Sequence, residues 1–353
     1  MQGASSSSIS LTEHYRRPLS AIEKDAYLKL FLEWASHHPE LSEVEAGVRM
    51  VVEALLQSPH FLYRVEDSAA PDSQLVTLDG YEVASRLSYA FWNTMPSDEL
   101  FAAAEAGELG RQEGVREWAA KMFDDPRTEA SFGSFHEQAF EMERYSDLDK
   151  SVELFPEWDR EMGASMKTEA SLFLGGEVFG GGGVRELLTS NRAYVDAEMA
   201  ALYGVEGDFG ADFVPVDLDR EQRSGMLTRL GFLTQNATLA QSDPIHRGVF
   251  VNLNLICRPL SAVPELPETL EPVGETNRER INSITGPGTC GAGCHATLIN
   301  PIGFALEHYD ALGQYRDEES GLPVNAADTY VFQDGRAIRW REHRLAAFQE
   351  VQS

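Results

Sequence analysis

The chain has 353 residues, of which 42% are hydrophobic and 10% aromatic, so it is long enough for about two or three domains that each bury a core. Its 29 lysine and arginine residues stand against 57 aspartate and glutamate residues, which leaves a formal net charge of −28 at pH 7. Such a surface repels phosphate backbones and anionic membranes, which argues against a nucleic-acid partner, and no stretch approaches the roughly 20 apolar residues that a membrane-spanning helix needs.

The first residues, Met1-Gln2-Gly3-Ala4 followed by four serines, contain neither the basic nor the apolar region of a signal peptide. We interpret 1–14 as a disordered leader. Its abrupt passage into Arg16-Arg17-Pro18-Leu19 favours a fragment of a longer polypeptide from which an export signal has been cut.

Apolar residues recur at helical spacing through most of the chain, which predicts a mainly α-helical fold. The segment 15–68 is expected to form an N-terminal helical module that is interrupted at Ser58-Pro59. The segment 75–257 is expected to form a central helical body, in which a helix starts at Asp79-Gly80 and stops before Pro96. Further amphipathic helices are predicted over 98–144, 156–174 and 184–203.

The region after these helices is predicted to be less regular. Four glycines at 180–183 indicate a loop rather than a phosphate-binding site, because no strand precedes them and no Lys-Ser or Lys-Thr follows. Short strands are expected only at 213–216 and 330–332. Prolines 259, 264, 267 and 272 predict an extended linker over 258–276, which leads to a small loop-rich Cys-His module at 277–330 and a truncated tail at 331–353.

The three cysteines, Cys257, Cys290 and Cys294, all lie in the last hundred residues, which indicates one site or one staple. In c-type attachment, two thiols add to the vinyl groups of a haem, and a histidine directly after the second cysteine ligates the iron. The run from Cys290 to Cys294 and His295 has this form with three residues between the cysteines instead of two. The small residues 291–293 would let the backbone approach the porphyrin edge.

Three other interpretations remain open for these cysteines. A disulfide Cys257–Cys290 or Cys257–Cys294 would make the chain a cofactor-free secreted binding or scaffold domain. The thiols could also join His295 or His308 in a zinc site, although a full tetrahedral set with suitable spacing is missing. Alternatively, all three thiols are unpaired.

If a haem is present, its sixth ligand does not come from a methionine of the Cys-His module, because no methionine follows Met226. The candidates are His246, His308 and His343, a methionine of the helical body, or no ligand at all. A vacant position favours oxygen or peroxide chemistry, and a filled one favours electron transfer. Arg247, beside His246, could contact a haem propionate, or it could simply tie a loop to the start of a helix.

We predict that Cys290, Cys294 and His295 share one short helical turn with both sulfurs facing a common cavity.

Several stretches together resemble a known family. From the first two thirds of the chain these are Arg16-Arg17-Pro18-Leu19, 56–64, 84–92, Gly225-Met226-Leu227-Thr228, 244–248 and Cys257. From the last third they are Cys294-His295, Asn300–Ala305, Tyr309-Asp310, Gly313 and Arg316. This set, spanning about 15–325, resembles bacterial multi-module cytochrome-c-linked domains of unknown function, which are exported haem proteins of planctomycete and myxobacterial type.

The resemblance implies a periplasmic or extracellular one-electron redox protein, either an electron carrier or the redox arm of an extracellular oxidoreductase, with no settled enzymatic activity. It implies covalent haem c at Cys290 and Cys294, and His295 as the proximal iron ligand. The expected partners are a redox protein and further modules of the same longer polypeptide. The chain departs from the family in the extra residue between the cysteines and in its abrupt end after Arg339.

Overall fold

The computed structural model describes residues 15–33, 38, 40–66, 77–260 and 271–339, so the predicted leader 1–14 and most of the predicted linker and tail lie outside the described residues. The chain divides into two compact units, 1–132 and 133–353. Helices dominate both units, which confirms the mainly α-helical prediction. No helix in the described ranges has the length and apolar character needed to cross a bilayer.

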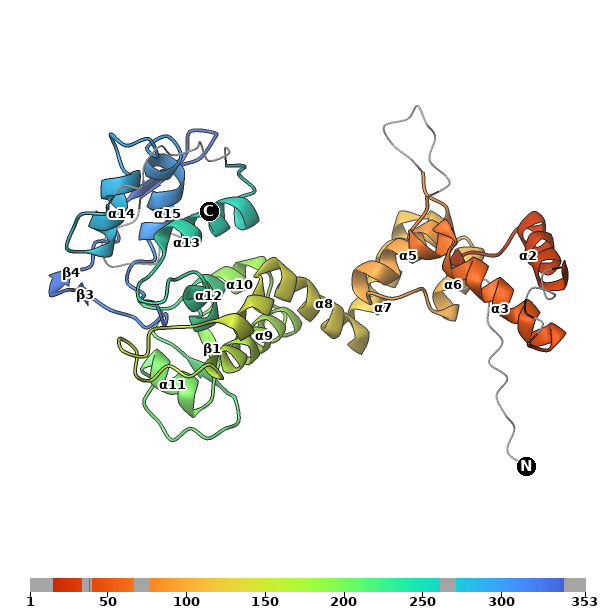
Figure 1. The fold of residues 1–353 in the computed structure, drawn as a ribbon, viewed down its shortest axis with the longest axis horizontal. Coiled ribbons are helices and arrows are strands. Elements are labelled where there is room, and N and C mark those ends of the chain that lie inside the picture. The colour runs from red at the N-terminus through yellow and green to blue at the C-terminus, as the bar shows by residue number, and fades with distance from the viewer. Residues whose placement is uncertain (1–14, 34–37, 39, 67–76, 261–270, 340–353) are drawn as a thin grey trace. The chain divides into compact units, whose positions relative to one another are not determined.

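The first unit begins with a pair of packed helices. Ser42 caps the second helix reciprocally with Glu45, and Gly47 lets the two helices approach, because a Cβ there would lie 2.8 Å from the ring of Phe31. The break predicted at Ser58-Pro59 is confirmed, with Ser58 capping the short helix that follows. These elements are α2 (Ala21–Glu33), α3 (Glu43–Leu56) and α4 (Pro59–Leu62) (Figure 1).

The rest of the first unit packs around a small core that contains Trp92, Leu100 and Met122. The predicted start at Asp79 is confirmed by its capping box with Glu82. The long stretch 98–144 is divided into several helices, because Gly107 adopts a left-handed φ of 74° and later turns break the run again. The elements are α5 (Gly80–Phe91), α6 (Asp98–Glu105), η2 (Glu108–Gly110), α7 (Gln112–Phe123) and α8 (Pro126–Ala139), and the boundary between the units falls inside α8.

In the second unit the single helix predicted over 184–203 is wrong, because a strand interrupts it. Ala193 and Val195 point into the core while their neighbours are more exposed, and Asp196 then caps a new helix by accepting from the N–H of Met199. The loop predicted at 180–183 is confirmed. The elements are η3 (Met142–Asp147), α9 (Met162–Phe179), α10 (Val184–Thr189), β1 (Arg192–Val195), α11 (Ala197–Tyr203) and β2 (Val214–Asp217). β1 and β2 pair antiparallel, from Arg192 opposite Asp217 to Val195 opposite Val214.

The remaining elements of the second unit are short. Two of them, η5 and η6, are π turns, in which the backbone N–H bonds five residues back. The helical elements are η4 (Met226–Thr228), α12 (Leu230–Gln235), α13 (Pro244–Phe250), η5 (Val251–Leu255), α14 (Asn277–Thr285), η6 (His295–Ile299) and α15 (Asn300–Phe304). The strands form two hairpins, β3 (Glu318–Glu319) with β4 (Leu322–Pro323), and β5 (Thr329–Val331) with β6 (Ala337–Arg339).

One hydrophobic core unites the second unit. It includes buried side chains from Phe140 to Val251 and from Ile302 to Tyr330, and α13 packs against α15 (Figure 1). The region 277–330 therefore shares its core with the helices that precede it instead of packing on its own. The unit boundary falls within 75–257, the segment that the sequence pattern presents as one helical body.

Candidate functional site

The Cys-His motif occupies the connection between α14 and η6. The N–H groups of Cys294 and His295 both donate to the carbonyl oxygen of Gly291, at 3.2 and 2.8 Å. The carbonyl of Cys294 then accepts from Leu298 and Ile299, which starts the π turn. Cys294 and His295 thus begin one helical segment, whereas Cys290 lies in the turn before it. Whether the two sulfurs face a common cavity stays a prediction.

All three cysteines are free thiols, with Cys257 and Cys290 exposed and Cys294 half-buried. Neither of the two disulfides considered from the sequence is formed. Within the described ranges, no group of three or more histidine, cysteine, aspartate or glutamate side chains is arranged to hold a metal ion, so the zinc alternative finds no ligand cluster there.

The ring of His295 is half-buried, and its Nδ1 atom is fully buried without a hydrogen-bond partner. Burial lowers the pKa of His295, and a contact with the side chain of Asn300 opposes part of that shift. Gly291 packs directly on the ring, because a Cβ at this position would lie 3.3 Å from both His295 Cδ2 and the Cα of Thr285. Gly293, in contrast, faces open space. Of the two glycines in the motif, Gly291 is therefore the one that the packing requires.

Asn252 holds the π turn that carries His295. Its buried amide Nδ2 donates to the carbonyl of Gly248 at 2.8 Å and to the carbonyl of Leu298 at 3.0 Å. Its Oδ1 accepts from the hydroxyl of Tyr330 at 2.9 Å. Gly248 allows this approach, since a Cβ there would lie 2.2 Å from the carbonyl oxygen of Ile299. Asn252 therefore fastens η5, η6 and β5 together.

Arg247 is fully buried and surrounded by backbone. All five of its N–H groups donate to carbonyl oxygens, which belong to Asn236, Leu306, Tyr309, Leu233 and Asp310. Burial lowers the pKa of Arg247 to about 10. Of the two roles considered from the sequence, the structure supports the one in which Arg247 holds loops together. The predicted contact with a haem propionate is wrong, because all five N–H groups of the guanidinium already donate to backbone carbonyls.

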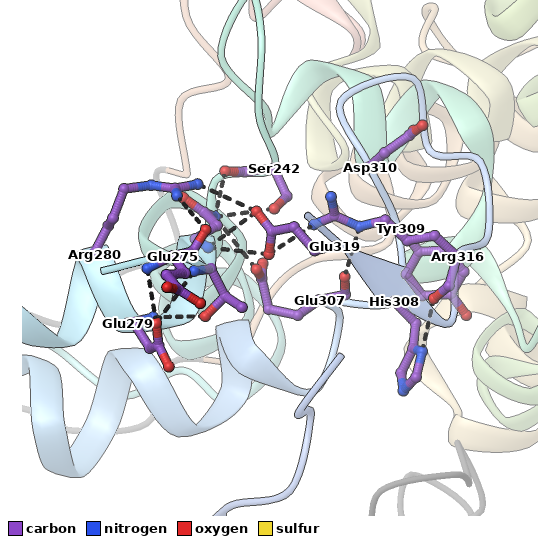
Figure 2. A network of polar contacts seen from close by, with 12 residues as sticks. Ser242, Glu275, Glu279, Arg280, Glu307, His308, Tyr309, Asp310, Arg316 and Glu319 are labelled. Atoms are coloured by element: carbon purple, nitrogen blue, oxygen red, sulfur yellow. Dashed lines mark hydrogen bonds and ion pairs between the residues drawn. The ribbon is translucent and has the colours of Figure 1, made fainter. Parts of the chain in front are cut away.

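A polar network fixes the helix that leads into the motif, and Figure 2 shows Glu319 and Glu307 between Arg280 and Arg316. The carboxylate of Glu319 accepts from the backbone N–H of Asn277 at 3.0 Å and from Arg280 at 3.2 Å, and it lies 3.7 Å from Arg316. The side-chain amide of Asn277 donates to Ser242 and to buried Glu307. Burial raises the pKa of Glu307. The start of α14 is thereby anchored to the chain on both sides of the motif.

The candidate sixth ligands differ in burial and in hydrogen bonding. His308 is buried, its Nδ1 contacts the carbonyl of Arg316 at 2.9 Å, and its ring stacks on Tyr315 with centroids 5.3 Å apart. The side chain of His246 is 70% exposed, and its Nδ1 bonds the carboxylate of Asp243, which raises the pKa of His246. His343 lies outside the described residues.

Sequence reasoning missed two residues at this site, Asn252 and Asn300. A partial signal for the first existed, because Asn252 and Asn254 are the two polar residues in the otherwise apolar run from Val249 to Ile256. Asn300 begins one of the stretches that carry the family resemblance, but it stands five residues after His295, a spacing that an ordinary helix does not bring onto one face, so no pattern predicts its contact with His295.

The second unit is a helical unit whose Cys-His motif lies outside its hydrophobic core, with Cys290 exposed and Cys294 half-buried. Three family models match in sequence: protein of unknown function DUF1595 at 11–66, DUF1592 at 78–205 and DUF1588 at 223–319. The chain belongs to the planctomycete-type family of multi-module cytochrome-c-linked domains of unknown function. The motif lies within the DUF1588 match. No curated protein and no solved structure matches the chain.

Proposed function

We propose that the second unit carries a covalent c-type haem and serves in one-electron transfer. In this proposal the thiols of Cys290 and Cys294 form the two thioethers, and Nε2 of His295 is the proximal iron ligand. The observation that carries the proposal is the state of these three side chains: both thiols are free, and the half-buried imidazole directly after them holds its Nδ1 atom buried.

The residues fit this group. Cys290 is exposed and Cys294 half-buried, so both sulfurs are unpaired nucleophiles at the surface of the unit. Gly291 and the polar network around Glu319 hold the segments on either side of the motif. When bound, a c-type haem supplies a one-electron couple whose potential depends on its axial ligands and their hydrogen bonds.

Covalent haem and clustered oxidisable cysteines both suit an oxidising compartment, so we propose a periplasmic or extracellular location. The acidic surface, with a net charge of −28, favours a redox partner that presents a basic patch. In this proposal the haem serves either an electron carrier or the redox arm of an extracellular oxidoreductase.

The test is production of the full chain together with haem-maturation machinery, followed by haem staining after denaturation and by ferric and ferrous absorption spectra. We expect covalent haem in the natural chain and in the control Cys257→Ala, and its loss in the double variant Cys290→Ala/Cys294→Ala. His295→Ala should change the absorption spectrum. A colourless natural chain in which Cys257 is oxidised to a disulfide with Cys290 or Cys294 would instead support a cofactor-free scaffold.

A further inference from the structure

The π turn after the motif brings two polar side chains together. In an α-helix, residues five apart point about 140° away from each other. In η6 the N–H of Asn300 bonds the carbonyl of His295, so the turn is wider than in an α-helix and brings residues five apart toward the same side of the helix. The contact between them is the one that favours the protonated form of His295.

Both facing atoms lack a partner. Nδ1 of His295 and Oδ1 of Asn300 are each buried, and neither makes a hydrogen bond of ordinary geometry within the part of the chain that the structure describes. Unpaired buried polar atoms are costly, and here one is a ring nitrogen that donates in one of its two tautomers and the other is an amide oxygen that accepts.

The orientation of the Asn300 amide is fixed from its other side. Its Nδ2 donates to the hydroxyl oxygen of Thr285 at 2.9 Å. The Thr285 hydroxyl donates its hydrogen to the carbonyl oxygen of Ile281 at 2.7 Å, so its oxygen can only accept a hydrogen bond from Asn300. The amide nitrogen must therefore face Thr285, and Oδ1 must face His295.

We propose that Asn300 is the positioning residue of His295: its Oδ1 accepts a hydrogen bond from Nδ1–H and so leaves Nε2 unprotonated for a metal. Ligating histidines characteristically donate their second ring nitrogen to an oxygen, which fixes the tautomer and the ring orientation. The inference rests on the proposed haem function for its purpose, but the hydrogen bond itself does not need the haem.

The strength of this hydrogen bond sets how much electron density His295 gives to the iron. Removing the acceptor with Asn300→Leu weakens the donation and raises the reduction potential. Replacing the amide with a carboxylate in Asn300→Asp strengthens the acceptor and lowers the potential below that of the natural chain. A residue with a merely structural role would not give shifts of opposite sign.

The first arm of the experiment uses the haem-free full chain with ¹⁵N-labelled histidine, in which the His295 signals are assigned by their loss in His295→Ala. We expect the Nδ1–H tautomer in the natural chain and a change toward Nε2–H in Asn300→Leu. Thr297→Ser is the matched control, because Thr297 lies exposed on the same turn and serine keeps the hydroxyl that bonds the carbonyl of Gly293. An Nε2–H tautomer in the natural chain, or no change in Asn300→Leu, overturns the proposal.

The second arm measures the reduction potential of the haem-loaded full chain and its variants. Opposite shifts in Asn300→Leu and Asn300→Asp support the proposal, and equal potentials in both overturn it. If Asn300→Leu does not fold, Thr285→Val removes the anchor of the amide and is expected to mix the two tautomers. If no haem attaches to the natural chain while His295 is the Nδ1–H tautomer, the haem function fails and the positioning role stands.

Discussion

Asn252 donates a hydrogen bond from its side-chain amide to the carbonyl oxygen of Leu298 at 3.0 Å, and this bond fastens one π turn to another. π turns are rare because they disturb the regular i to i−4 bonding, and they persist where tertiary contacts support them. Here the supported turn is the one that begins with His295. Asn252 therefore links the buried core of the second unit to the turn that positions His295, the candidate iron ligand.

Replacing Asn252 with alanine should lower the free energy of unfolding of the second unit by about 2–4 kcal/mol, because it leaves the carbonyls of Gly248 and Leu298 and the hydroxyl of Tyr330 without a buried partner. Urea unfolding of the full chain measures this. The control is Asn254→Ala, an exposed amide on the same π turn, which should change stability by less than about 0.5 kcal/mol. Equal effects of the two substitutions would mean that Asn252 does not hold the π turn.

Arg247→Lys should be strongly destabilising although it preserves the charge. An ammonium has three donors on one atom and cannot reach the five carbonyl oxygens that the planar guanidinium bonds. At least about 3 kcal/mol should be lost, since two or more buried carbonyls become unpaired. The same exchange at exposed Arg160 is the control and should be nearly neutral. A small loss at Arg247 would show that the five bonds are largely replaceable.

Glu169→Gln should remove part of the pH dependence of stability. Glu169 is fully buried 3.9 Å from Arg229, and burial raises its pKa from 4.5 to about 7. Between these values the native state holds a proton that the unfolded chain releases, so stability falls as pH rises from about 4.5 to 7. The natural chain should lose about 2–3 kcal/mol more than the variant across this window. Parallel stability curves from thermal or urea unfolding at each pH would contradict this expectation.

Much of the fold was readable from local signals. Capping residues such as Ser42, Ser58 and Asp79 mark helix starts in the sequence, and the structure uses all three. The strand β1 escaped prediction because its four residues sit between two helical patterns, and only pairing with β2 stabilises it. Tertiary contacts therefore determine that these four residues form a strand, as they do for most short strands.

The candidate site shows the same division. The motif residues Cys290, Cys294 and His295 carry a spacing that can be recognised in the sequence, whereas Arg247 and Asn252 act through backbone carbonyls that only the fold brings together. The proposed pairing of His295 with Asn300 depends on a π turn, which no residue propensity predicts from the sequence. Side chains that hydrogen-bond distant backbone carbonyls have no characteristic sequence spacing, so their role cannot be predicted from the sequence.

The last prediction concerns the sixth iron ligand of the haem-loaded chain. We expect His246→Ala to change the ferric absorption spectrum, because the His246 side chain is exposed on α13, which packs against η6. His308→Ala should instead lower stability and leave the spectrum unchanged, since the His308 ring is buried against Tyr315 and its Nδ1 contacts the carbonyl of Arg316. With two imidazole ligands, the reduction potential should lie below that of a histidine–methionine pair, because imidazole stabilises ferric iron better than a thioether does.

The outcomes of this test are distinct. If neither substitution alters the spectrum and the near-infrared methionine-to-iron band is present, a methionine at or before Met226 holds the position, and His246 is not the ligand. If neither alters it and that band is absent, the sixth position is vacant or occupied by water, which favours oxygen or peroxide chemistry over simple electron transfer. A changed spectrum in His308→Ala alone would mean that the ring leaves its stack on Tyr315 when the haem is attached.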